Sequence, residues 1–439
     1  MEVTLQQANK GLRGSLEVPG DKSISHRAIM LGALAQGVTT VKNFSDGQDC
    51  LTTLAAFKKL GVEIDFDTQA KKVVINGRGF HGLRVAKEAL DMGNSGTTTR
   101  LLMGILAASS FETSLVGDPS LSKRPMARVT EPLAKMGASI KISSQQTLPA
   151  LIEPSSLKGT TIRLKVASAQ VKSALILAAL QAKGESTIIE KLPTRNHTEL
   201  MLKQFGANIE TLADGLTIKV QPTKELRGQE LVVPGDISSA AFFMVAAALT
   251  HNSKVKLINV SLNPTRTGIL RVLEKMNANM TIQARQSDGE PLGDIIVESS
   301  KLTAIKIGPK DVPALIDELP LVALLAAHAD GISEIRGAAE LRFKETDRIK
   351  TVCQELGKLG VNVKELQDGM VIEGQPQLRV TADISWDSHG DHRLGMLGAV
   401  AALRNPGQFR LKNSQALGIS YPSFNWLSEF DSGVTWWLR

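Results

Sequence analysis

Apolar residues in this chain gather in segments rich in Ala and Leu, and each segment begins directly after small polar residues. The first segment shows the pattern, because Gly20 and Asp21 indicate a turn and a helix cap. Behind them, Ile24, Ala28 and Leu31 recur at the spacing of one helix face. Six such helices are predicted, with starts near Gly20, Gly93, Ser168, Gly235, Asp317 and Gly390. The starts recur at intervals of roughly 73 residues, which indicates an internal repeat.

A second helix follows the first in five of these repeats. The predicted ranges are Leu51–Ile64, Val129–Ile140, Thr198–Ile209, Gly268–Met280 and Asp347–Val363. A glycine, or Asn277 in the fourth repeat, supplies a stop signal near the end of each range. A short β-branched strand then follows, such as Val73–Ile75. The sixth repeat is truncated, with Tyr421–Phe430 as its only candidate for a second helix.

Each repeat is therefore predicted to contain strand, helix, strand and helix, followed by further strands, which places the chain in the α/β class. A period of this length exceeds that of most solenoids, so repeated lobes of globular domains fit better than an extended array. Two similar sequences, Val18–Asp21 and Val233–Asp236, divide the chain into halves of three repeats. We expect one domain at residues 20–234 and a second formed by residues 1–19 together with 235–439. Helix starts from both domains are expected to face one cleft, which would hold the active site.

Composition narrows the classes of function. The 439 residues carry a net charge of +7 with 4% aromatic residues, and basic residues stand singly beside Ser, Asp, Glu and Gly. Nucleic-acid-binding proteins usually gather basic residues on one face and interleave aromatics, so small acidic substrates are the better expectation. Cys50 and Cys353 lie far apart, which argues against a disulfide framework or a zinc site. We predict no membrane span and no targeting leader, and hence a cytoplasmic protein.

Candidate binding residues lie at the predicted helix starts. Lys22, Ser23 and Arg27 surround the first start, where unpaired N–H groups and the helix dipole also favour an anion. Gly93–Arg100 opens the second repeat with Gly, Asn, Ser and Thr, but it lacks the Gly-Lys-Ser/Thr ending of a P-loop. Arg124 precedes a proline, and its planar guanidinium suits a carboxylate or phosphate. Taken alone, Lys22, Ser23 and Arg27 are better explained by a capped surface helix with solvated charges, and Gly93–Arg100 equally well by a capped buried helix. A single surface arginine such as Arg124 is weak evidence by itself.

The third and last repeats add further polar helix starts. Ser168–Lys172 opens the third repeat, and Arg195–Glu199 precedes its second helix. His197 and Glu199 suggest a metal site, but a solvated helix cap is the better interpretation without a third ligand. His392–Arg393 opens the last repeat after a Gly-Asp turn, and a structural role for the histidine is the alternative there.

The second half of the chain contributes the acids. Asp317 precedes a buried apolar segment and is either a helix cap or a base at the helix mouth. Lys344–Arg348 is interpreted as one turn of helix, in which Lys344 and Arg348 are i,i+4 neighbours beside Glu345. Ordinary surface ion pairing is the alternative. Cations at several helix starts and carboxylates at others together predict an enzyme for substrates that carry several negative charges.

These motifs resemble those of the 5-enolpyruvylshikimate-3-phosphate synthase family, in its class II branch. The signatures are Gly20-Asp21-Lys22, Ser168–Lys172, Arg195–Glu199 and Asn263-Pro264-Thr265-Arg266, and the likeness extends over the whole chain. The resemblance implies a two-domain inside-out α/β barrel, in which each domain has three βαβαββ repeats with buried helices. It also implies transfer of the enolpyruvyl group of phosphoenolpyruvate to the 5-hydroxyl of shikimate 3-phosphate, with release of phosphate, in chorismate and aromatic amino-acid biosynthesis.

Family roles carried over residue by residue give two binding sets and a catalytic set. The resemblance implies that shikimate 3-phosphate contacts Lys22, Ser23, Arg27, Ser168, Ala169, Gln170, Arg195, Asp317 and Lys344. It implies that phosphoenolpyruvate contacts Lys22, Asn94, Gly96, Arg124, Gln170, Arg348, His392 and Arg393. Asp317 would accept the proton of the 5-hydroxyl, and Glu345 with Lys22 would protonate the methylene carbon. No metal, no organic cofactor, no nucleic acid and no membrane are implied, and the protein is expected to be a monomer.

Two alternatives remain open. A related family transfers enolpyruvyl to UDP-N-acetylglucosamine and typically uses a cysteine on a mobile loop, whereas Cys50 and Cys353 lie in predicted helices here. A basic nucleic-acid-binding protein without catalysis is disfavoured by the few aromatic residues. One departure concerns the C-terminal region, where another branch of the family carries a Lys shortly before a Ser/Thr-Phe/Tyr-Pro triplet. Ala416–Pro422 contains no Lys, so no role is assigned there.

Overall fold

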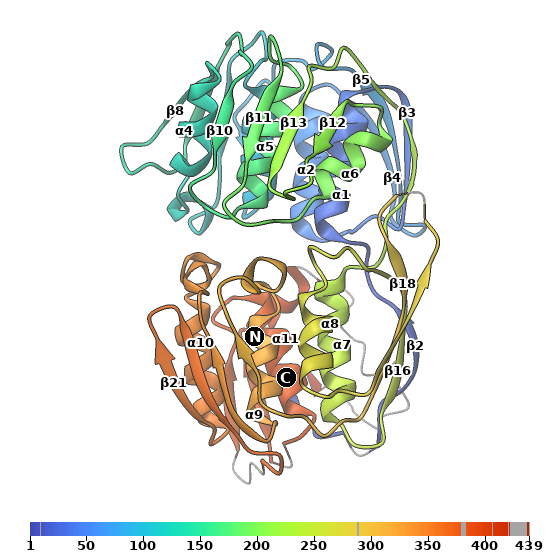
Figure 1. The fold of residues 1–439 in the computed structure, drawn as a ribbon, viewed down its shortest axis with the longest axis vertical. Coiled ribbons are helices and arrows are strands. Elements are labelled where there is room, and N and C mark those ends of the chain that lie inside the picture. Colours follow the sequence, from blue (N-terminus) through green and yellow to red (C-terminus); the bar gives the residue numbers. More distant parts are fainter. Residues whose placement is uncertain are drawn as a thin grey trace. The chain divides into compact units, whose positions relative to one another are not determined.

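The structure of this protein is a computed structural model that describes residues 1–8, 10–287, 289–378, 383–405, 407–419, 421 and 437–438. The chain forms two compact units, labelled by element in Figure 1. Unit 1 consists of Met1–Pro19 and Gly235–Arg439, and unit 2 consists of Gly20–Pro234. The chain therefore passes from one unit to the other at two Val-Pro-Gly-Asp sequences.

Unit 2 alternates strands and helices throughout. Its elements are α1 (Lys22–Leu34), β3 (Ala35–Lys42), α2 (Gln48–Lys59), β4 (Glu63–Asp67), β5 (Lys72–Arg78), β6 (Leu90–Asp91), α3 (Gly96–Leu106), β7 (Thr113–Val116), η1 (Leu121–Lys123), α4 (Ala127–Lys135), β8 (Ser139–Ile142), β9 (Ala150–Glu153), β10 (Thr161–Arg163), α5 (Ala169–Ala179), β11 (Ser186–Ile189), α6 (His197–Gln204), β12 (Ile209–Thr211), β13 (Thr217–Val220), β14 (Leu226–Arg227) and β15 (Glu230–Val232).

Unit 1 follows the same alternation, with two strands before the first crossing. Its elements are β1 (Glu2–Leu5), β2 (Arg13–Glu17), α7 (Ile237–Leu249), β16 (Lys254–Ser261), α8 (Gly268–Lys275), β17 (Met280–Arg285), β18 (Leu292–Glu298), β19 (Lys306–Ile307), η2 (Val312–Ala314), α9 (Leu319–Ala327), β20 (Gly331–Ile335), η3 (Ala339–Phe343), α10 (Arg348–Lys358), β21 (Asn362–Leu366), β22 (Gly369–Gly374), β23 (Ile384–Asp387), α11 (His392–Ala402), β24 (Phe409–Lys412), η4 (Ser414–Ile419) and β25 (Trp437–Leu438).

The six sheets formed by the described residues share one strand arrangement. Their orders are β14-β3-β5-β4 (with β15 also on β3), β6-β7-β9-β8, β10-β11-β13-β12, β2-β16-β18-β17, β19-β20-β22-β21 and β23-β24-β1-β25. In β6-β7-β9-β8, for example, the first pair is parallel and the other two pairs are antiparallel. A helix connects the parallel strands in such a unit, as a crossover requires. The repeated βαβαββ unit confirms the predicted fold class.

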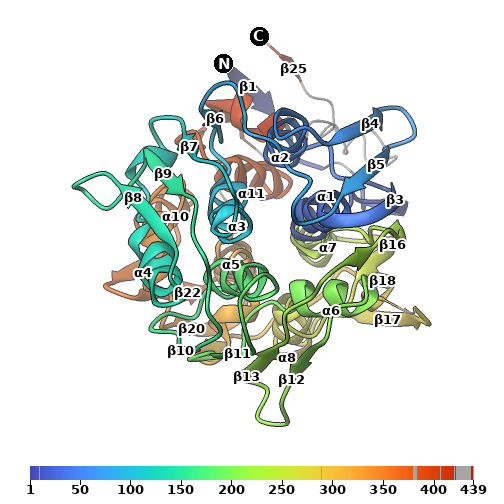
Figure 2. The same cartoon turned by 90° about the horizontal axis from the view of Figure 1, so that it is seen from above.

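The first helix of each repeat is buried inside its unit, with the sheets outside it (Figure 2). In α1 every residue from Ile24 to Leu34 is buried, and α7 and α9 are apolar on all sides. A helix that is apolar all round must be covered by other elements, so the composition of these segments explains their place. Helices α3 and α5 approach closely at Gly104, where a Cβ atom would lie 2.1 Å from the carbonyl oxygen of Ala174.

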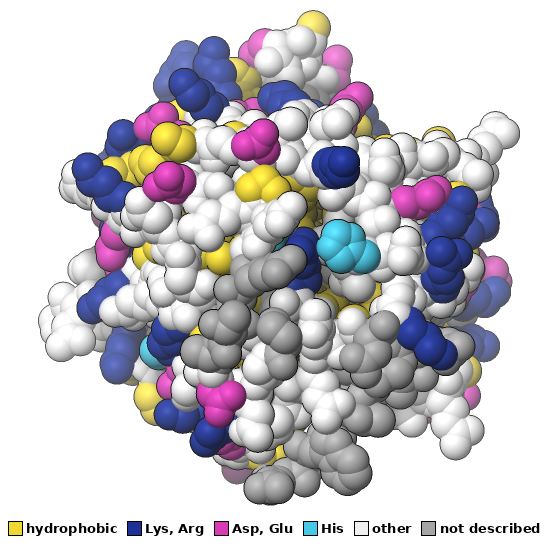
Figure 3. Space-filling model, turned by 90° about the horizontal axis from the view of Figure 1, so that it is seen from below, with side chains coloured by type: hydrophobic (Ala, Val, Ile, Leu, Met, Phe, Trp, Pro, Cys, Tyr) yellow, Lys and Arg dark blue, Asp and Glu magenta, His cyan; other side chains and the backbone are white. Residues whose placement is uncertain are grey.

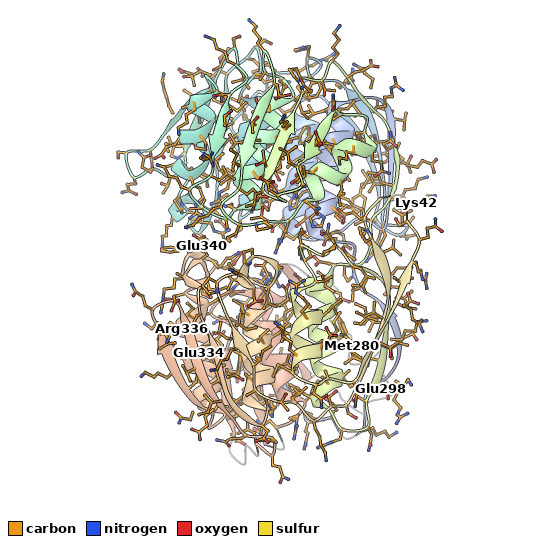
Figure 4. All side chains as sticks on the ribbon, viewed as in Figure 1. Lys42, Met280, Glu298, Glu334, Arg336 and Glu340 are labelled. Atoms are coloured by element: carbon orange, nitrogen blue, oxygen red, sulfur yellow. The ribbon has the colours of Figure 1, made fainter. Side chains whose placement is uncertain are left out.

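Charged side chains lie on the outer faces of the sheets. In unit 1, Glu334 and Arg336 project from β20 and its end and form an ion pair of 2.7 Å (Figure 4). Glu298 pairs with Lys254 across neighbouring strands at 3.0 Å. Such exposed pairs contribute little to stability. Among the described residues, no helix combines the length and the apolar character that a membrane crossing needs.

The six buried helices begin where the sequence predicts, but the second helices end earlier than predicted. Helix α2 ends at Lys59 rather than at Ile64, and α10 ends at Lys358 rather than at Val363. The same holds for α4, α6 and α8, which end at Lys135, Gln204 and Lys275. Each stop residue has a positive φ, from 63° at Asn277 to 96° at Gly137. The last residue of each predicted range belongs to the next strand.

The truncated sixth repeat ends in the part of the chain that is only partly described. The segment Ser414–Ile419 forms the short helix η4. The predicted second helix Tyr421–Phe430 lies outside the described residues except for Tyr421, as do Ser420 and Pro422 of the C-terminal motif. Cys50 and Cys353 lie in α2 and α10, as predicted, and both are buried.

Candidate active site

The start of α1 presents Lys22 and Arg27 within unit 2. Asp21 caps the helix by accepting a hydrogen bond of 2.9 Å from the N–H of Ile24. Lys22 forms an ion pair with Asp49 of α2. Arg27 is buried, and its Nε donates to Thr198 Oγ1 at 2.7 Å. The guanidinium of Arg27 is thereby tied to the start of α6, which fixes its position before any ligand binds.

The start of α3 brings two arginines close to Gly96. Arg124 Nη2 donates to Asn94 Oδ1 at 2.7 Å, and Asn94 Nδ2 donates to Asp118 Oδ2 at 2.9 Å. A Cβ atom on Gly96 would lie 3.0 Å from Arg100 Nη1 and 3.4 Å from Arg124 Nη1. The absence of a side chain at Gly96 therefore lets both guanidinium groups approach the N–H groups of the first helical turn.

The start of α5 is joined to that of α3 by Gln170. Ser168 is the N-cap of α5, and Ala169 is its first residue. Gln170 Oε1 accepts a hydrogen bond of 2.6 Å from Arg100 Nη1, and Gln170 Nε2 donates to Thr97 Oγ1 at 3.0 Å. Sequence reasoning missed Arg100, although an arginine four residues after Gly96 in an apolar helix was the available signal.

Arg195 lies near the end of the loop that joins β11 to α6, and buried charged side chains hold this loop. Lys172 contacts Glu190 at 3.0 Å and Glu199 at 2.7 Å, and its Nζ donates to the carbonyl oxygen of Thr194 at 3.2 Å. Burial raises the pKa of Glu190, against the opposing effect of Lys172. Glu199 is thus a partner of Lys172, and the described residues contain no group of three or more His, Cys, Asp or Glu side chains that could hold a metal ion. The interpretation as a solvated cap is wrong, because Glu199 is buried and paired with Lys172.

Asp317 in unit 1 lies among three cations. Lys344 Nζ donates to Asp317 Oδ1 at 3.2 Å, and Arg348 Nη1 lies 3.8 Å from the same oxygen. Arg393 Nη1 donates to the main-chain oxygen of Asp317 at 3.2 Å. The cap interpretation of Asp317 is wrong, because Glu318 holds the N-cap position of α9 and makes no side-chain cap bond.

Lys344 and Arg348 do not share a helical turn, which corrects the sequence interpretation. Lys344 has an extended backbone after η3, and α10 begins at Arg348 behind the cap Asp347. The cap accepts the N–H of Lys350, so the polar run is split by the start of a helix. Glu345 nevertheless lies beside Arg348, whose Nη2 donates to Glu345 Oε2 at 2.6 Å.

Arg348 also contacts the start of α11. Its Nε donates to Asp391 Oδ2 at 2.7 Å, and Asp391 caps α11 by accepting the N–H of Arg393 at 2.9 Å. Burial opposes the charge of Arg348, but Asp391 and Glu345 outweigh it and raise the pKa of the guanidinium above its usual range. His392 is the first residue of α11 and is buried.

A second buried network, missed from the sequence, lies beside Asp317. Glu318 accepts a hydrogen bond from Ser238 Oγ, and Arg266 Nη2 donates to the same hydroxyl at 2.8 Å. Arg266 also pairs with Asp236, the cap of α7, at 3.2 Å. Arg266 had a place in a family signature but no role. The network links the starts of α7 and α9.

Each unit thus gathers its own share of the predicted residues. In unit 2 the helix starts hold Lys22, Ser23, Arg27, Asn94, Gly96, Arg124, Ser168, Ala169, Gln170 and Arg195. In unit 1 they hold Asp317, Lys344, Glu345, Arg348, His392 and Arg393. The first set is suited to anions, and the second combines cations with two carboxylates.

Comparison with known proteins decides the family. A family model described as EPSP synthase (3-phosphoshikimate 1-carboxyvinyltransferase) matches residues 6–426. The chain belongs to the EPSP synthase family. A relative from Limosilactobacillus fermentum named 3-phosphoshikimate 1-carboxyvinyltransferase is 56% identical over 416 residues, which cover 95% of this chain and 96% of the relative. One of the same name from Lactiplantibacillus plantarum is 54% identical over 424 residues, covering 96% of this chain and 97% of the relative.

Solved structures agree with this membership in the EPSP synthase family. A structure of EPSP synthase from Acinetobacter baumannii has a TM-score of 0.88 and 41% identity, and the match covers 100% of both chains. The enolpyruvyl transferase NikO from Streptomyces tendae has a TM-score of 0.79 at 16% identity, covering 99% of this chain and 98% of the other. At that identity, NikO shows the fold alone.

Proposed function

We propose that this chain transfers the enolpyruvyl group of phosphoenolpyruvate to the 5-hydroxyl of shikimate 3-phosphate and releases inorganic phosphate. The observation that carries the proposal is the cluster around Arg348, which lies 3.8 Å from Asp317 and 2.6 Å from Glu345. The reaction needs a base and an acid beside cations, because an alcohol loses a proton and a methylene carbon gains one between two anionic substrates. The family of the chain supports the same reaction.

In the proposed reaction Asp317 takes the proton of the 5-hydroxyl, and that oxygen attacks C2 of phosphoenolpyruvate. Glu345, with Lys22, delivers a proton to the methylene carbon, which becomes a methyl group in a tetrahedral intermediate. The bond from C2 to the phosphate oxygen then breaks, and the methyl group loses a proton to restore the double bond. Carboxylates near C2 stabilise the positive charge that develops there.

The helix starts of unit 2 bind the anionic groups in this proposal. Helix N-termini offer unpaired N–H groups, and Arg side chains add bidentate donors for phosphate or carboxylate. Shikimate 3-phosphate and phosphoenolpyruvate take the two residue sets given by the family resemblance. Residues of both units act on one pair of substrates, so variants in either unit are expected to impair the same turnover.

The proposal includes a monomeric, cytoplasmic protein. Its substrates are small molecules, and it does not bind nucleic acid. On the face drawn in Figure 3, setting the grey residues aside, Lys and Arg side chains lie in several separate groups with Asp and Glu side chains between them. This dispersion supports small acidic substrates over a nucleic-acid track, which needs a continuous basic surface. Light scattering on the purified chain tests the monomer, and a dimer mass would refute that part.

A phosphate-release assay tests the function. The chain is incubated with phosphoenolpyruvate and either shikimate 3-phosphate or UDP-N-acetylglucosamine. We expect phosphate with shikimate 3-phosphate alone. Release of phosphate with the UDP-sugar alone would support the alternative transferase. Release with neither acceptor would refute the proposal that the chain is an enolpyruvyl transferase.

The base is tested by Asp317→Asn, which keeps the size of the side chain and removes its basicity. We expect turnover to fall by about 10²–10⁴-fold, the usual contribution of a general base, while shikimate 3-phosphate still binds in calorimetry. Asp330→Asn is the matched control, because Asp330 is exposed and lies directly before β20. Unchanged turnover of Asp317→Asn would remove its role as the base.

A further inference from the structure

A buried row of polar side chains joins α1, α2 and the start of α3 in unit 2. His26 Nδ1 lies 2.6 Å from Thr53 Oγ1, and Thr53 Oγ1 lies 2.6 Å from Thr98 Oγ1. Thr98 Oγ1 lies 2.6 Å from Ser95 Oγ, the side chain that caps α3. The four residues are 0%, 0%, 0% and 1% exposed, in that order, so water does not compete for these bonds.

The histidine at the inner end of the row is neutral. Burial lowers the pKa of His26 to about 3, Asp49 opposes this, and Lys22 and Arg27 act with burial. One ring nitrogen therefore carries the single proton at neutral pH. The other nitrogen, Nε2, is buried and has no hydrogen-bond partner in the described part of the chain.

The unpartnered Nε2 distinguishes the two tautomers of the ring. A buried N–H without an acceptor is rarer in proteins than an acceptor without a donor. With the proton on Nδ1, which Thr53 accepts, the ring leaves only a lone pair without a partner. In the opposite tautomer Nδ1 would accept from Thr53, and a buried Nε2–H would have no acceptor among the described residues.

This tautomer sets the direction of the remaining bonds. Thr53 and Thr98 also lie 3.3 and 3.5 Å from the main-chain oxygen of Asp49, beyond the usual O–H···O range, so the 2.6 Å contacts carry the protons. Thr53 then donates to Thr98, and Thr98 donates to Ser95. Ser95 Oγ also accepts the N–H of Thr98 at 3.2 Å, so it is the acceptor in both bonds, and its own O–H is the one donor of the row for which the described residues provide no acceptor.

We propose that His26 is a positioning residue, which as the Nδ1–H tautomer directs the row His26→Thr53→Thr98→Ser95 and holds the first turn of α3 in place. Asn94 and Gly96 flank Ser95, and Asn94 accepts from Arg124 at 2.7 Å. The row therefore fixes the residues that bind phosphoenolpyruvate in the proposed function, on which this inference rests. A small displacement of residues at such a site lowers the affinity for the ligand more than it lowers the stability of the fold.

Two substitutions of His26 separate the nitrogens. The amide of Asn reaches the position of Nδ1 and offers an N–H there, whereas the longer Gln places its amide near Nε2, which has no partner. His26→Asn therefore preserves the row, and His26→Gln breaks it. Thr98→Val breaks the row at its third member without changing the histidine. His81→Gln is a surface control, because His81 is exposed.

The kinetic test measures KM for each substrate and kcat. We expect His26→Gln and Thr98→Val to raise KM for phosphoenolpyruvate about tenfold, the value of one hydrogen bond, with smaller changes in KM for shikimate 3-phosphate and in kcat. His26→Asn and His81→Gln remain within about twofold of wild type. Because the two changes act on one row, His26→Gln with Thr98→Val is no worse than the worse single variant. Equal KM values for His26→Asn and His26→Gln would overturn the proposal.

A second measurement does not depend on turnover. Nitrogen-15 NMR of the histidine-labelled wild-type protein, with His26→Asn used for assignment, reports which ring nitrogen is protonated. We expect a protonated Nδ1 and an unprotonated Nε2 that do not change between pH 6 and 8. A protonated Nε2 would overturn the inference even if His26→Gln fails to fold. Absence of phosphate release by the wild-type protein would instead refute the proposed function. The NMR result would then still test the tautomer of His26 and the direction of the hydrogen bonds in the row.

Discussion

The guanidinium of Arg348 and the carboxylate of Asp391 form a two-point contact. Nε donates to Oδ2 at 2.7 Å, Nη2 donates to Oδ1 at 3.1 Å, and the side chains are 1% and 0% exposed. Asp391 is at the same time the cap of α11. One carboxylate thus fixes the start of α10 relative to the start of α11, and both starts carry candidate site residues.

Asp391→Asn is expected to destabilise the protein strongly. Arg348 would remain buried with a weakened partner, and breaking a buried pair costs about 3–5 kcal/mol. Glu345 still contacts Arg348, so we expect a value near the lower end. Urea unfolding at pH 7 measures the change in free energy of unfolding.

The control for Asp391→Asn is an exposed pair. Glu131 lies 3.8 Å from Lys165, and their side chains are 63% and 85% exposed. Glu131→Gln should change the free energy of unfolding by less than about 1 kcal/mol. An equally small effect of Asp391→Asn would contradict a structural role of the buried pair.

The stabilisation by Asp391 also depends on pH. Burial would raise the pKa of Asp391, but Arg348 holds this pKa below its usual range. The stabilisation is therefore present above about pH 4 and is lost at lower pH.

The contribution of Glu318 to stability is expected to depend on pH with the opposite sign to that of Asp391. Burial raises its pKa, against the charge of Arg266. A raised acid pKa gives stability below the unfolded value of about 4.3, and this stability is lost as the pH rises through the folded value. Glu318→Gln stays neutral and can still accept from Ser238. Its free energy of unfolding should therefore gain on wild type as the pH rises from 4 to 8, as urea titrations at each pH would measure. A difference that is constant with pH would argue that Glu318 keeps an ordinary pKa.

Lys172→Met is expected to disturb the loop that ends at Arg195. The change leaves Glu190 and Glu199 buried without their cation, at a cost of about 3–5 kcal/mol. Because Lys172 also binds the main chain of Thr194, we expect a higher KM for shikimate 3-phosphate with a smaller change in kcat. Steady-state kinetics and thermal unfolding measure the two effects.

A surface control and a combined variant separate the effect of the Lys172 charge from the effect of its packing. Lys165→Met removes an amine that is 85% exposed and should alter neither quantity. The combination of Lys172→Met, Glu190→Gln and Glu199→Gln removes all three charges and should recover most of the stability, since neutral groups lose less on burial. If the combined variant is no more stable than Lys172→Met, packing of the lysine stem and not its charge is the cause.

Helix starts could be predicted from the sequence because caps are local. Asp21, Ser95 and Asp391 each accept a main-chain N–H two or three residues later, so the signal and the structure lie in one turn. Helix ends could not be placed as well. Helix α2 ends at Lys59, just before the stop residue Gly61, but the apolar pattern continues through Val62 and Ile64 into β4. Periodicity over so few residues does not separate helix from strand.

The contacts of the site depend on packing that a single sequence does not reveal. Arg100 and Gln170 are 70 positions apart, and Arg348 and Asp391 are 43 apart. They meet because separate helices place their starts together within one unit. The residue types at each start were predictable, whereas the pairs were not. Lys344 shows the same limit, because its run of polar residues is consistent with a helical turn until the cap Asp347 is known to bond the N–H of Lys350.

Gly96→Ala is expected to weaken binding of phosphoenolpyruvate without harming the fold. The new methyl group would lie 3.0 Å from Arg100 Nη1 and 3.4 Å from Arg124 Nη1. Both neighbours are the ends of flexible side chains, so they move and the helix remains intact, since Ala is favourable in a helix. Displaced guanidinium groups lose part of a charge-assisted contact, so KM for phosphoenolpyruvate should rise about tenfold. KM for shikimate 3-phosphate, measured in the same assay, should change less.

Gly357→Ala provides the comparison, because it lies inside α10 and a Cβ there would meet no atom within 4 Å. This variant should gain about 0.5–1 kcal/mol of stability from helix propensity alone, with both KM values unchanged. Gly96→Ala, at the first position of α3, should unfold close to the temperature of the wild type and should differ from Gly357→Ala in KM. A rise in KM for both variants would point to a general effect of glycine replacement, and no rise for Gly96→Ala would mean that the two arginines do not bind phosphoenolpyruvate from the positions seen at the start of α3.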